Sequence, residues 1–148
     1  MNKRTWFLLF FVGLFFTYVN IPLKEIDPDL TPYYDEFMGL YNDICPNREL
    51  PKKVIIRFNL KSGTVIGTCT RSYKRAVIEI DPFNWYLSPL MDRKQLMFHE
   101  LTHCLLKLSH VDEKYINNYM NPVLYPLEEA ELNSQVINNM IYVCGNIK

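Results

Sequence analysis

The sequence has no concentration of charge of one sign. Its sixteen basic residues balance its sixteen acidic residues, and no basic run is longer than a pair such as Lys52-Lys53. A protein that binds nucleic acid normally carries an electropositive run or stripe, so the sequence predicts no nucleic-acid partner. Internal repeats and low-complexity tracts are absent too. The 148 residues, 49% of them hydrophobic and 22% charged, therefore predict a single globular domain rather than a disordered or repetitive protein.

No apolar run reaches the roughly 20 residues that a membrane-spanning helix needs. The longest, from Trp6 to Val19 (residues 6–19), follows Lys3 and Arg4. A short basic region before about 7–15 apolar residues is typical of a secretory signal, but no small-x-small cleavage site follows this one. We therefore predict that residues 1–21 are a signal peptide or a retained N-terminal membrane anchor, with membrane association through the apolar run. In either case the protein is secreted or membrane-anchored and extracytoplasmic.

Cys-x-x-Cys pairs are absent, which argues against a zinc site made of thiolates. The four cysteines are far apart in the sequence: Cys45, Cys69, Cys104 and Cys144. An even number of cysteines in an exported chain favours disulfide bonds, with buried, reduced cysteines as the alternative. Four cysteines allow three pairings, and the sequence leaves the choice among them open.

Apolar periodicity and turn residues divide the rest of the chain. Residues 22–32 are rich in proline and predict a linker, so that the folded domain comprises residues 33–148. Apolar residues at helical spacing predict a helix over residues 33–44. Three strands are predicted from runs rich in β-branched residues, at 54–60, 64–72 and 76–82. Gly67 is expected to mark a bulge in the second of them.

The most strongly marked helix follows Ser88, a good N-cap residue, and Pro89, which suits the first helical position. Its apolar stripe has the spacing of one helical face and comprises Met97, Leu101, Cys104, Leu105 and Leu108. A terminal helix is predicted from about Leu127 to Val143, capped by Gly145. The order of helix, strands, long helix, irregular loop and helix predicts a small α+β domain.

All three histidines lie in the twelve residues HELTHCLLKLSH, from His99 to His110. His99 and His103 are four residues apart on the predicted long helix, so their imidazoles lie about 40° apart around its axis and can bind one ion. Glu100 is placed to accept a proton from water bound to that ion. Zinc suits imidazole ligands, and a catalytic zinc has three protein ligands and one open position. A third ligand is therefore required.

These residues resemble the active-site region of the metzincin zinc peptidases, the superfamily of matrix metallopeptidases and astacins. The family pattern is H-E-x-x-H-x-x-G-x-x-H followed by a turn that contains methionine, and YMNP at Tyr119–Pro122 resembles that turn. The resemblance covers roughly residues 33–148, with its specific motifs in residues 99–122. It implies a metzincin-like domain with an N-terminal helix, a short mixed sheet, the active-site helix, a Met-turn and a C-terminal helix.

The resemblance also implies the zinc site, with His110 as third ligand, Glu100 as general base and Met120 as the apolar floor below the metal. Two features depart from the family pattern: His110 follows His99 by eleven residues rather than ten, and the family glycine is absent. That glycine ends the helix in a conformation that costs other residues about 1–2 kcal/mol. We expect the longer bend to reverse the chain without one strained residue. The spacing is similar to that of short bacterial and phage-type metzincin-like sequences with H-E-L-x-H-C.

Other residues compete for the third ligand position. In gluzincin-type peptidases a glutamate from a downstream helix binds the zinc, and Glu128, Glu129 and Glu131 lie at the start of the terminal helix. Acidic residues also favour the first turn of a helix through its dipole, which is the simpler explanation. Asp112 and Glu113 either orient a ligand histidine or belong to a solvated loop.

The sequence thus predicts a monomeric zinc-dependent endopeptidase whose peptide or protein substrate lies along an edge strand, within residues 65–72 or 76–80. Zinc would polarise the scissile carbonyl, and Glu100 would take a proton from the attacking water and give it to the leaving amine. A gluzincin-like peptidase with Glu128 or Glu131 as ligand is one alternative. A zinc-containing binding or structural module is the other, although a purely structural site has no use for Glu100.

Overall fold

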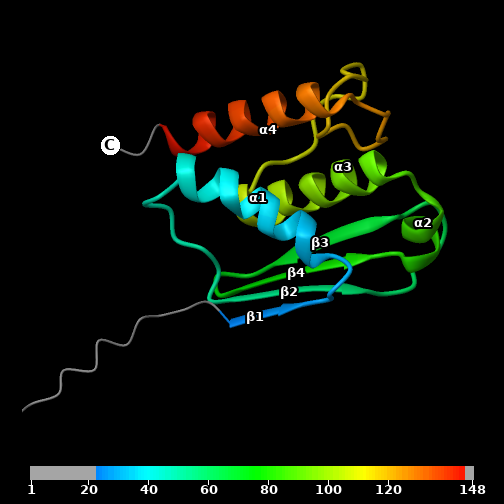
Figure 1. Cartoon of the computed structure of the whole chain (residues 1–148), viewed down its shortest axis with the longest axis horizontal. Helices are drawn as coiled ribbons and strands as arrows, with labels where there is room; N and C mark the ends of the chain where they lie inside the picture. The colour runs from blue at the N-terminus through cyan, green and yellow to red at the C-terminus, as the bar shows by residue number, and fades with distance from the viewer. Residues whose placement is uncertain (1–22, 146–148) are drawn as a thin grey trace, which may run out of the picture.

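The computed structural model describes residues 23–145 (Figure 1). The predicted signal or anchor at residues 1–21 lies outside these residues. In chain order the elements are β1 (Leu23–Ile26), α1 (Thr31–Ile44), β2 (Lys53–Phe58), β3 (Gly67–Arg71), β4 (Arg75–Ile80), α2 (Pro82–Leu87), α3 (Leu90–Leu101), a π-helical turn (Thr102–Leu106) and α4 (Glu129–Cys144). None of the helices in this part of the chain is both long and apolar enough to cross a membrane.

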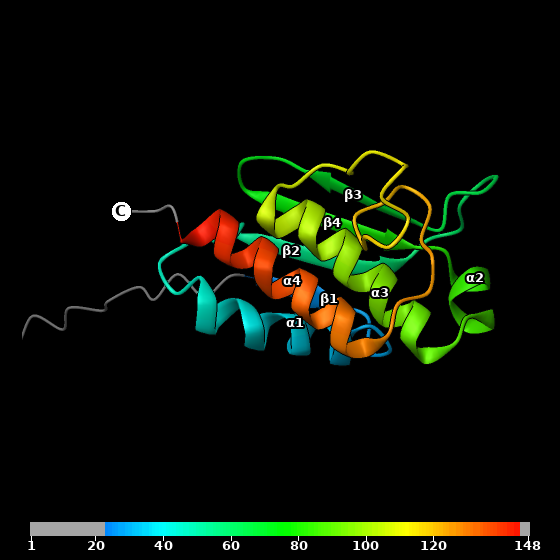
Figure 2. The same ribbon diagram turned by 90° about the horizontal axis from the view of Figure 1, so that it is seen from above.

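The four strands form one mixed sheet in the order β1-β2-β4-β3. Strands β1, β2 and β4 are parallel, whereas β3 is antiparallel to β4 and lies at one edge. Helices α1, α3 and α4 lie across one face of the sheet, as both views show (Figure 1, Figure 2). The molecule is therefore a mixed α+β domain with a small sheet, as the sequence predicts.

The core lies between the sheet and these three helices. Along β4, Ala76, Ile78 and Ile80 are buried at alternate positions, because successive residues of a strand point to opposite faces. Phe37 of α1 and Phe98 of α3 pack edge to face, with ring centroids 5.4 Å apart. This packing holds α3 against the rest of the domain and so fixes the helix that carries His99 and leads into the turn that carries His103.

Two disulfides settle the pairing that the sequence leaves open. Cys45, at the end of α1, bonds Cys144, at the end of α4. Cys69 of β3 bonds Cys104 in the π-helical turn. All four cysteines lie in the described part of the chain and none of them is free, so the alternative of reduced cysteines is wrong.

The prediction of a linker over residues 22–32 is wrong. Residues Leu23–Ile26 pair with β2, the Asp27 N–H donates to the Ile56 carbonyl oxygen, and Leu30 is wholly buried. Pro28 and Pro32 do not interrupt the strand, because Pro28 follows it and Pro32 lies in the first turn of α1, where a missing N–H breaks no hydrogen bond. The folded domain therefore includes β1 rather than beginning at residue 33.

The cap predicted at Ser88 belongs to a different helix. Asp81 caps a short helix, α2, that was not predicted, and its carboxylate accepts from the Asn84 backbone N–H at 3.0 Å. Ser88 ends α2, and its hydroxyl donates to the Asn84 carbonyl oxygen at 2.7 Å. Pro89 is the N-cap of α3 instead of its first helical residue. A helix as short as α2 contains too few turns for apolar periodicity to reveal it.

Candidate metal centre

The helix that carries the histidine motif changes type at its end. α3 stops at Leu101, and Thr102–Leu106 form a π-helical turn, in which the hydrogen bonds span five residues instead of four. Lys107 follows in the left-handed conformation, with φ 63° and ψ 29°. The π-helical turn takes up one extra residue, and Lys107 then reverses the chain toward His110. The eleven-residue spacing of the outer histidines follows from this insertion.

The expectation that a longer bend avoids a strained residue is therefore wrong. Within residues 23–145, Lys107 is the only residue other than glycine with a positive φ, and it takes the conformation expected of the family glycine. Two arginines satisfy carbonyl groups of the turn: Arg71 donates to the His103 oxygen, and Arg48 donates to the Leu106 oxygen at 3.2 Å. Cations beside the carbonyl end of a helix are stabilising, so these contacts support the bend.

Replacing Lys107 with glycine is expected to raise the free energy of unfolding by about 1 kcal/mol, because glycine adopts a positive φ without the steric conflict of a Cβ. Urea unfolding of the disulfide-bonded chain measures the change. Lys107→Ala is the matched control, since it removes the same charge but keeps the Cβ, and it should give no gain. An equal gain from both variants would assign the effect to the lysine charge and contradict the backbone explanation.

Three imidazole nitrogens converge beside the π-helical turn. His99 Nε2 lies 3.0 Å from His103 Nε2 and 3.0 Å from His110 Nε2. Among the described residues, these histidines are the only group of three or more metal-ligating side chains whose donor atoms all lie within 4.8 Å of one another. Nitrogens that bind a tetrahedral zinc at about 2.0–2.1 Å are about 3.3 Å apart. The three side chains therefore fit one metal ion.

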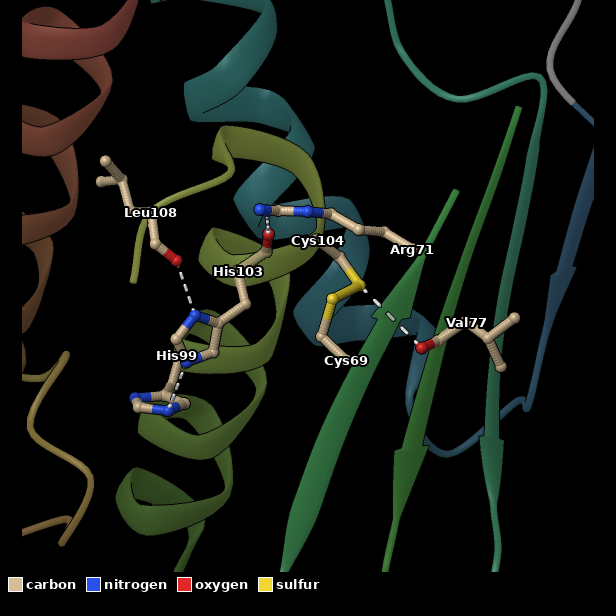
Figure 3. Close-up of a disulfide and its surroundings, with 7 residues drawn as sticks. All are labelled: Cys69, Arg71, Val77, His99, His103, Cys104 and Leu108. Atoms are coloured by element: carbon tan, nitrogen blue, oxygen red, sulfur yellow. Dashed lines mark hydrogen bonds between the residues drawn. A yellow bond between two sulfur atoms is a disulfide. The ribbon is translucent and has the colours of Figure 1, made fainter. Parts of the chain in front are cut away.

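The backbone fixes the second ring nitrogen of the two helix histidines. His99 Nδ1 lies 2.7 Å from the Tyr119 carbonyl oxygen. His103 Nδ1 lies 2.7 Å from the Leu108 carbonyl oxygen (Figure 3). A carbonyl group only accepts hydrogen bonds, so in each neutral ring Nδ1 carries the proton and Nε2 has a lone pair. Two lone pairs that face each other at 3.0 Å repel unless a cation lies between them. The tautomers are thus the ones that metal binding requires.

Burial keeps both helix histidines neutral. Desolvation lowers the pKa of His99 to about 4, against the opposing effect of its hydrogen bond to Tyr119. Desolvation lowers the pKa of His103 as well. Neutral imidazole is the form that binds a metal ion, so at neutral pH neither side chain has to lose a proton before binding.

The third histidine is exposed and comes from the loop after the bend. The Val111 N–H donates to the Met120 carbonyl oxygen at 3.0 Å, which ties this loop to the YMNP segment. In the same segment, Tyr119 bonds His99 through its carbonyl oxygen and Thr102 through its hydroxyl group, the latter at 2.9 Å. The YMNP segment therefore fixes the position of the loop histidine relative to the helix histidines.

Met120, the residue that matches the family methionine, lies in the hydrophobic core and is 1% exposed. Its backbone N–H donates to Asn118 Oδ1 at 2.8 Å. The buried amide of Asn121 donates to the carbonyl oxygens of Glu113 and Tyr115. Neither asparagine was predicted to support the site, although asparagine in a loop between regular elements is a usual sign of a side-chain-stabilised turn.

Glu100 is buried beside the histidines, and β3 passes close to its carboxyl group. Burial raises the pKa of Glu100 to about 7, and the charge of Lys61 opposes the shift. A Cβ at Gly67 would lie 2.7 Å from Glu100 Oε1 and 3.0 Å from Leu96 Cδ1, which only glycine avoids. Gly67 pairs in regular register with Ile80, so the predicted bulge is wrong. The close approach of the carboxyl group is the reason for glycine here.

A cleft of about 1020 Å³ runs beside β3. The three histidines, Glu100 and residues 64–69 line it, together with residues 122–124 beyond the YMNP methionine. Among residues 23–145, β3 pairs with a strand on one side only, so its outer backbone groups are available to pair with another strand. Of the two runs predicted to align substrate, 65–72 contains this edge strand. The other, 76–80, is wrong, because it lies in β4, which pairs on both sides.

The Cys69–Cys104 disulfide joins the edge strand to the helix end that carries a histidine (Figure 3). Cys104 directly follows His103 in the sequence. Arg71, two residues after Cys69 on β3, donates to the His103 carbonyl oxygen in the same view (Figure 3). One covalent bond and one hydrogen bond therefore fix the wall of the cleft relative to His103.

The three glutamates that were alternatives to His110 as third ligand do not lie among the converging histidines. Glu128 is the exposed N-cap of α4, and Glu131 accepts from Gln135 at 3.2 Å. Glu129 pairs with the buried Lys94 at 2.6 Å. The group of converging metal-ligating side chains includes none of these glutamates.

Asp112 and Glu113 do not orient the helix histidines. Asp112 pairs with the exposed Lys114 at 3.2 Å, and Glu113 contributes its carbonyl oxygen to the turn. Backbone carbonyl oxygens of Tyr119 and Leu108 take the orienting position instead. The solvated-loop interpretation of the two acidic residues is therefore the one that agrees with the structure.

No protein family, curated protein sequence or solved structure matches this chain. A function is therefore inferred from the geometry of the site. It offers three convergent imidazoles, a buried carboxyl group next to the first of them, and a cleft along a free strand edge.

Proposed function

We propose that the protein is a zinc-dependent endopeptidase of metzincin-like type. The proposal is carried by the convergence of His99, His103 and His110, with the carboxyl group of Glu100 buried next to them on the same cleft. A site that binds metal only for structure closes its coordination and needs neither an adjacent carboxylate nor an open cleft. The order of elements, with the histidine helix between the sheet and a terminal helix, supports the resemblance to metzincins.

In this mechanism the bound zinc would supply a Lewis acid and lower the pKa of its water to about 7. His99 and His103 present Nε2 because their Nδ1–H groups donate to backbone carbonyl oxygens. Glu100 accepts a proton from the attacking water and transfers it to the leaving amine. Gly67 has no side chain, and the carboxyl group of Glu100 occupies the space next to it on the edge strand.

The proposed substrate is an extended peptide or protein segment that adds a strand to the free edge of β3 (Gly67–Arg71). Main-chain hydrogen bonds would align such a segment largely without regard to its sequence. Gly67 lies against Glu100, so pairing at this edge brings one peptide bond close to the general base. Apolar residues such as Val65 and Leu124 line the cleft beyond it and favour apolar substrate side chains.

The proposed location is outside the cytoplasm, either free or anchored. The two disulfides support it, because disulfides persist mainly in oxidising compartments. The basic residues and apolar run at the N-terminus, from Lys3 to Val19, are typical of exported proteins.

The full chain loaded with zinc is expected to cleave unstructured peptides, and a chelator should abolish the cleavage until zinc is restored. Mass spectrometry of the peptide fragments measures the activity, and metal analysis of the same sample measures the zinc content. Fragments that form equally well in the chelated sample would contradict zinc catalysis. A chain with stoichiometric zinc and no cleavage of any peptide in a diverse library would favour a non-catalytic zinc-binding module.

A further inference from the structure

Basic side chains that are far apart in the sequence come together at one end of the sheet. The parallel register pairs Leu23 with Lys53 and Lys53 with Arg75. The Lys53 N–H also donates to the Lys74 carbonyl oxygen at 3.0 Å. The start of β1, the start of β2 and the β3–β4 turn therefore lie side by side, at the left of the sheet in Figure 1. We call Lys52, Lys53, Lys74 and Arg75 the basic end.

The basic end is open to solvent and poorly neutralised. Lys52, Lys74 and Arg75 are exposed, and among the described residues the ion pair at this end is Lys53 with Glu25, at 3.2 Å. Tyr73, at the tip of the β3–β4 turn, is 92% exposed. Since the whole chain has no net charge, the gathering of four cations here is a segregation of charge rather than a general excess.

The chain enters the domain at this same end. The Leu23 N–H donates to the Lys52 carbonyl oxygen at 2.9 Å. In the sequence, three residues separate Leu23 from Val19, the last residue of the apolar run. At about 3.3–3.6 Å per residue, the four steps from Val19 to Leu23 span at most about 14 Å. A bilayer that takes up the run lies within this reach of Leu23, so the connection allows the basic end to approach it to within a Debye length of about 8–10 Å.

We propose that the basic end docks on an anionic lipid surface, namely the bilayer to which the apolar run attaches the protein. Each lysine or arginine close to such a surface strengthens binding about fivefold, which corresponds to about 1 kcal/mol. A single acyl chain attaches a protein to a membrane only marginally, and a basic patch beside it makes the attachment stable; the basic end would add to the apolar run in the same way. An exposed tyrosine such as Tyr73 suits the headgroup region, where its ring is buried and its hydroxyl group stays hydrated.

Other polyanions explain these observations less well. Nucleic acid or an acidic protein would also attract the four cations. Neither accounts for the position of the basic end directly beside the point where the apolar run joins the domain. The lipid surface explains both features with one partner.

Hydrogen exchange of the full chain, in phosphatidylcholine vesicles with and without phosphatidylserine, tests the proposal. The backbone amides of the β3–β4 turn should exchange more slowly in the anionic vesicles, and high salt should remove the difference. The double variant Lys52→Gln/Lys74→Gln should weaken docking about 25-fold, at about fivefold for each lysine. The control Arg57→Gln/Lys114→Gln removes the same charge elsewhere on the domain and should leave docking unchanged.

Equal exchange of the turn amides in the two kinds of vesicle would overturn the proposal. An equal loss of docking in the two double variants would overturn it as well, because the effect would then follow net charge and not the basic end. Slower exchange with a DNA duplex but not with anionic vesicles would assign the surface to nucleic acid instead.

Discussion

Replacing Glu100 with glutamine is expected to lower kcat for peptide hydrolysis by about 10²–10⁴-fold, the usual contribution of a general base, while the zinc content of the chain stays unchanged. Glutamine has nearly the size and shape of glutamate, so it fits the space that Gly67 leaves at this position. It has no lone pair of comparable basicity to accept the proton of the attacking water. The zinc ligands, His99, His103 and His110, are not changed.

Two measurements on one sample make this test sharp, namely metal analysis and the rate of cleavage of a peptide that the wild type cleaves. Glu113→Gln is the matched control, because Glu113 is an exposed loop residue and the chemical change is the same. It should keep both zinc and activity. A zinc-loaded Glu100→Gln variant with wild-type kcat would contradict the role proposed for Glu100.

Replacing His110 with alanine is expected to weaken zinc binding more than about 100-fold and to abolish hydrolysis. Removing even a residue that only orients a ligand typically weakens metal binding about 10–100-fold, so loss of a ligand should exceed that range. Because His110 is exposed, the stability of the metal-free chain should change little. Zinc titration against a competing chelator measures the affinity, and urea unfolding of the metal-free chain measures the stability.

Glu128→Ala is the control that separates the two possible third ligands. The Glu128 side chain makes no capping hydrogen bond to α4, so its removal should alter neither the fold nor the metal site. Full zinc affinity in His110→Ala together with its loss in Glu128→Ala would reverse the assignment and favour a gluzincin-like site.

The parts of the site that depend on local geometry could be predicted from the sequence. His99 and His103 lie on one helical face because they are four residues apart, whatever the rest of the fold does. The position of His110 depends on a loop, and the YMNP segment was the feature of the sequence that indicated His110 as the third ligand. Its Met120 carbonyl oxygen accepts from Val111 and so holds that loop.

The bend between the histidines could not be predicted, because groups distant in the sequence stabilise it. The π-helical turn exposes carbonyl groups that Arg71 of β3 and Arg48 of the loop between α1 and β2 satisfy. Nothing in the sequence of the turn itself distinguishes Lys107 as the residue with a positive φ. The pairing of Cys69 with Cys104 depends in the same way on how β3 packs against α3.

The basic end shows how a balanced sequence can still give a charged surface. Lys52-Lys53 and Lys74-Arg75 are only pairs in the sequence, and the composition is neutral. The parallel register of β2 and β4 places the two pairs side by side. The lack of a long basic run therefore does not exclude an electrostatic partner when strands start at the same end of a sheet.

The proposed function requires that three histidines bind one zinc ion and leave one position for water. X-ray absorption at the zinc edge, measured on the zinc-loaded full chain, tests it most directly. We predict four nitrogen or oxygen donors at about 2.0–2.1 Å, three of them imidazoles recognised by the scattering of their outer ring atoms, and two imidazoles in His110→Ala. A sulfur donor at about 2.3 Å, or a spectrum that His110→Ala does not change, would contradict it.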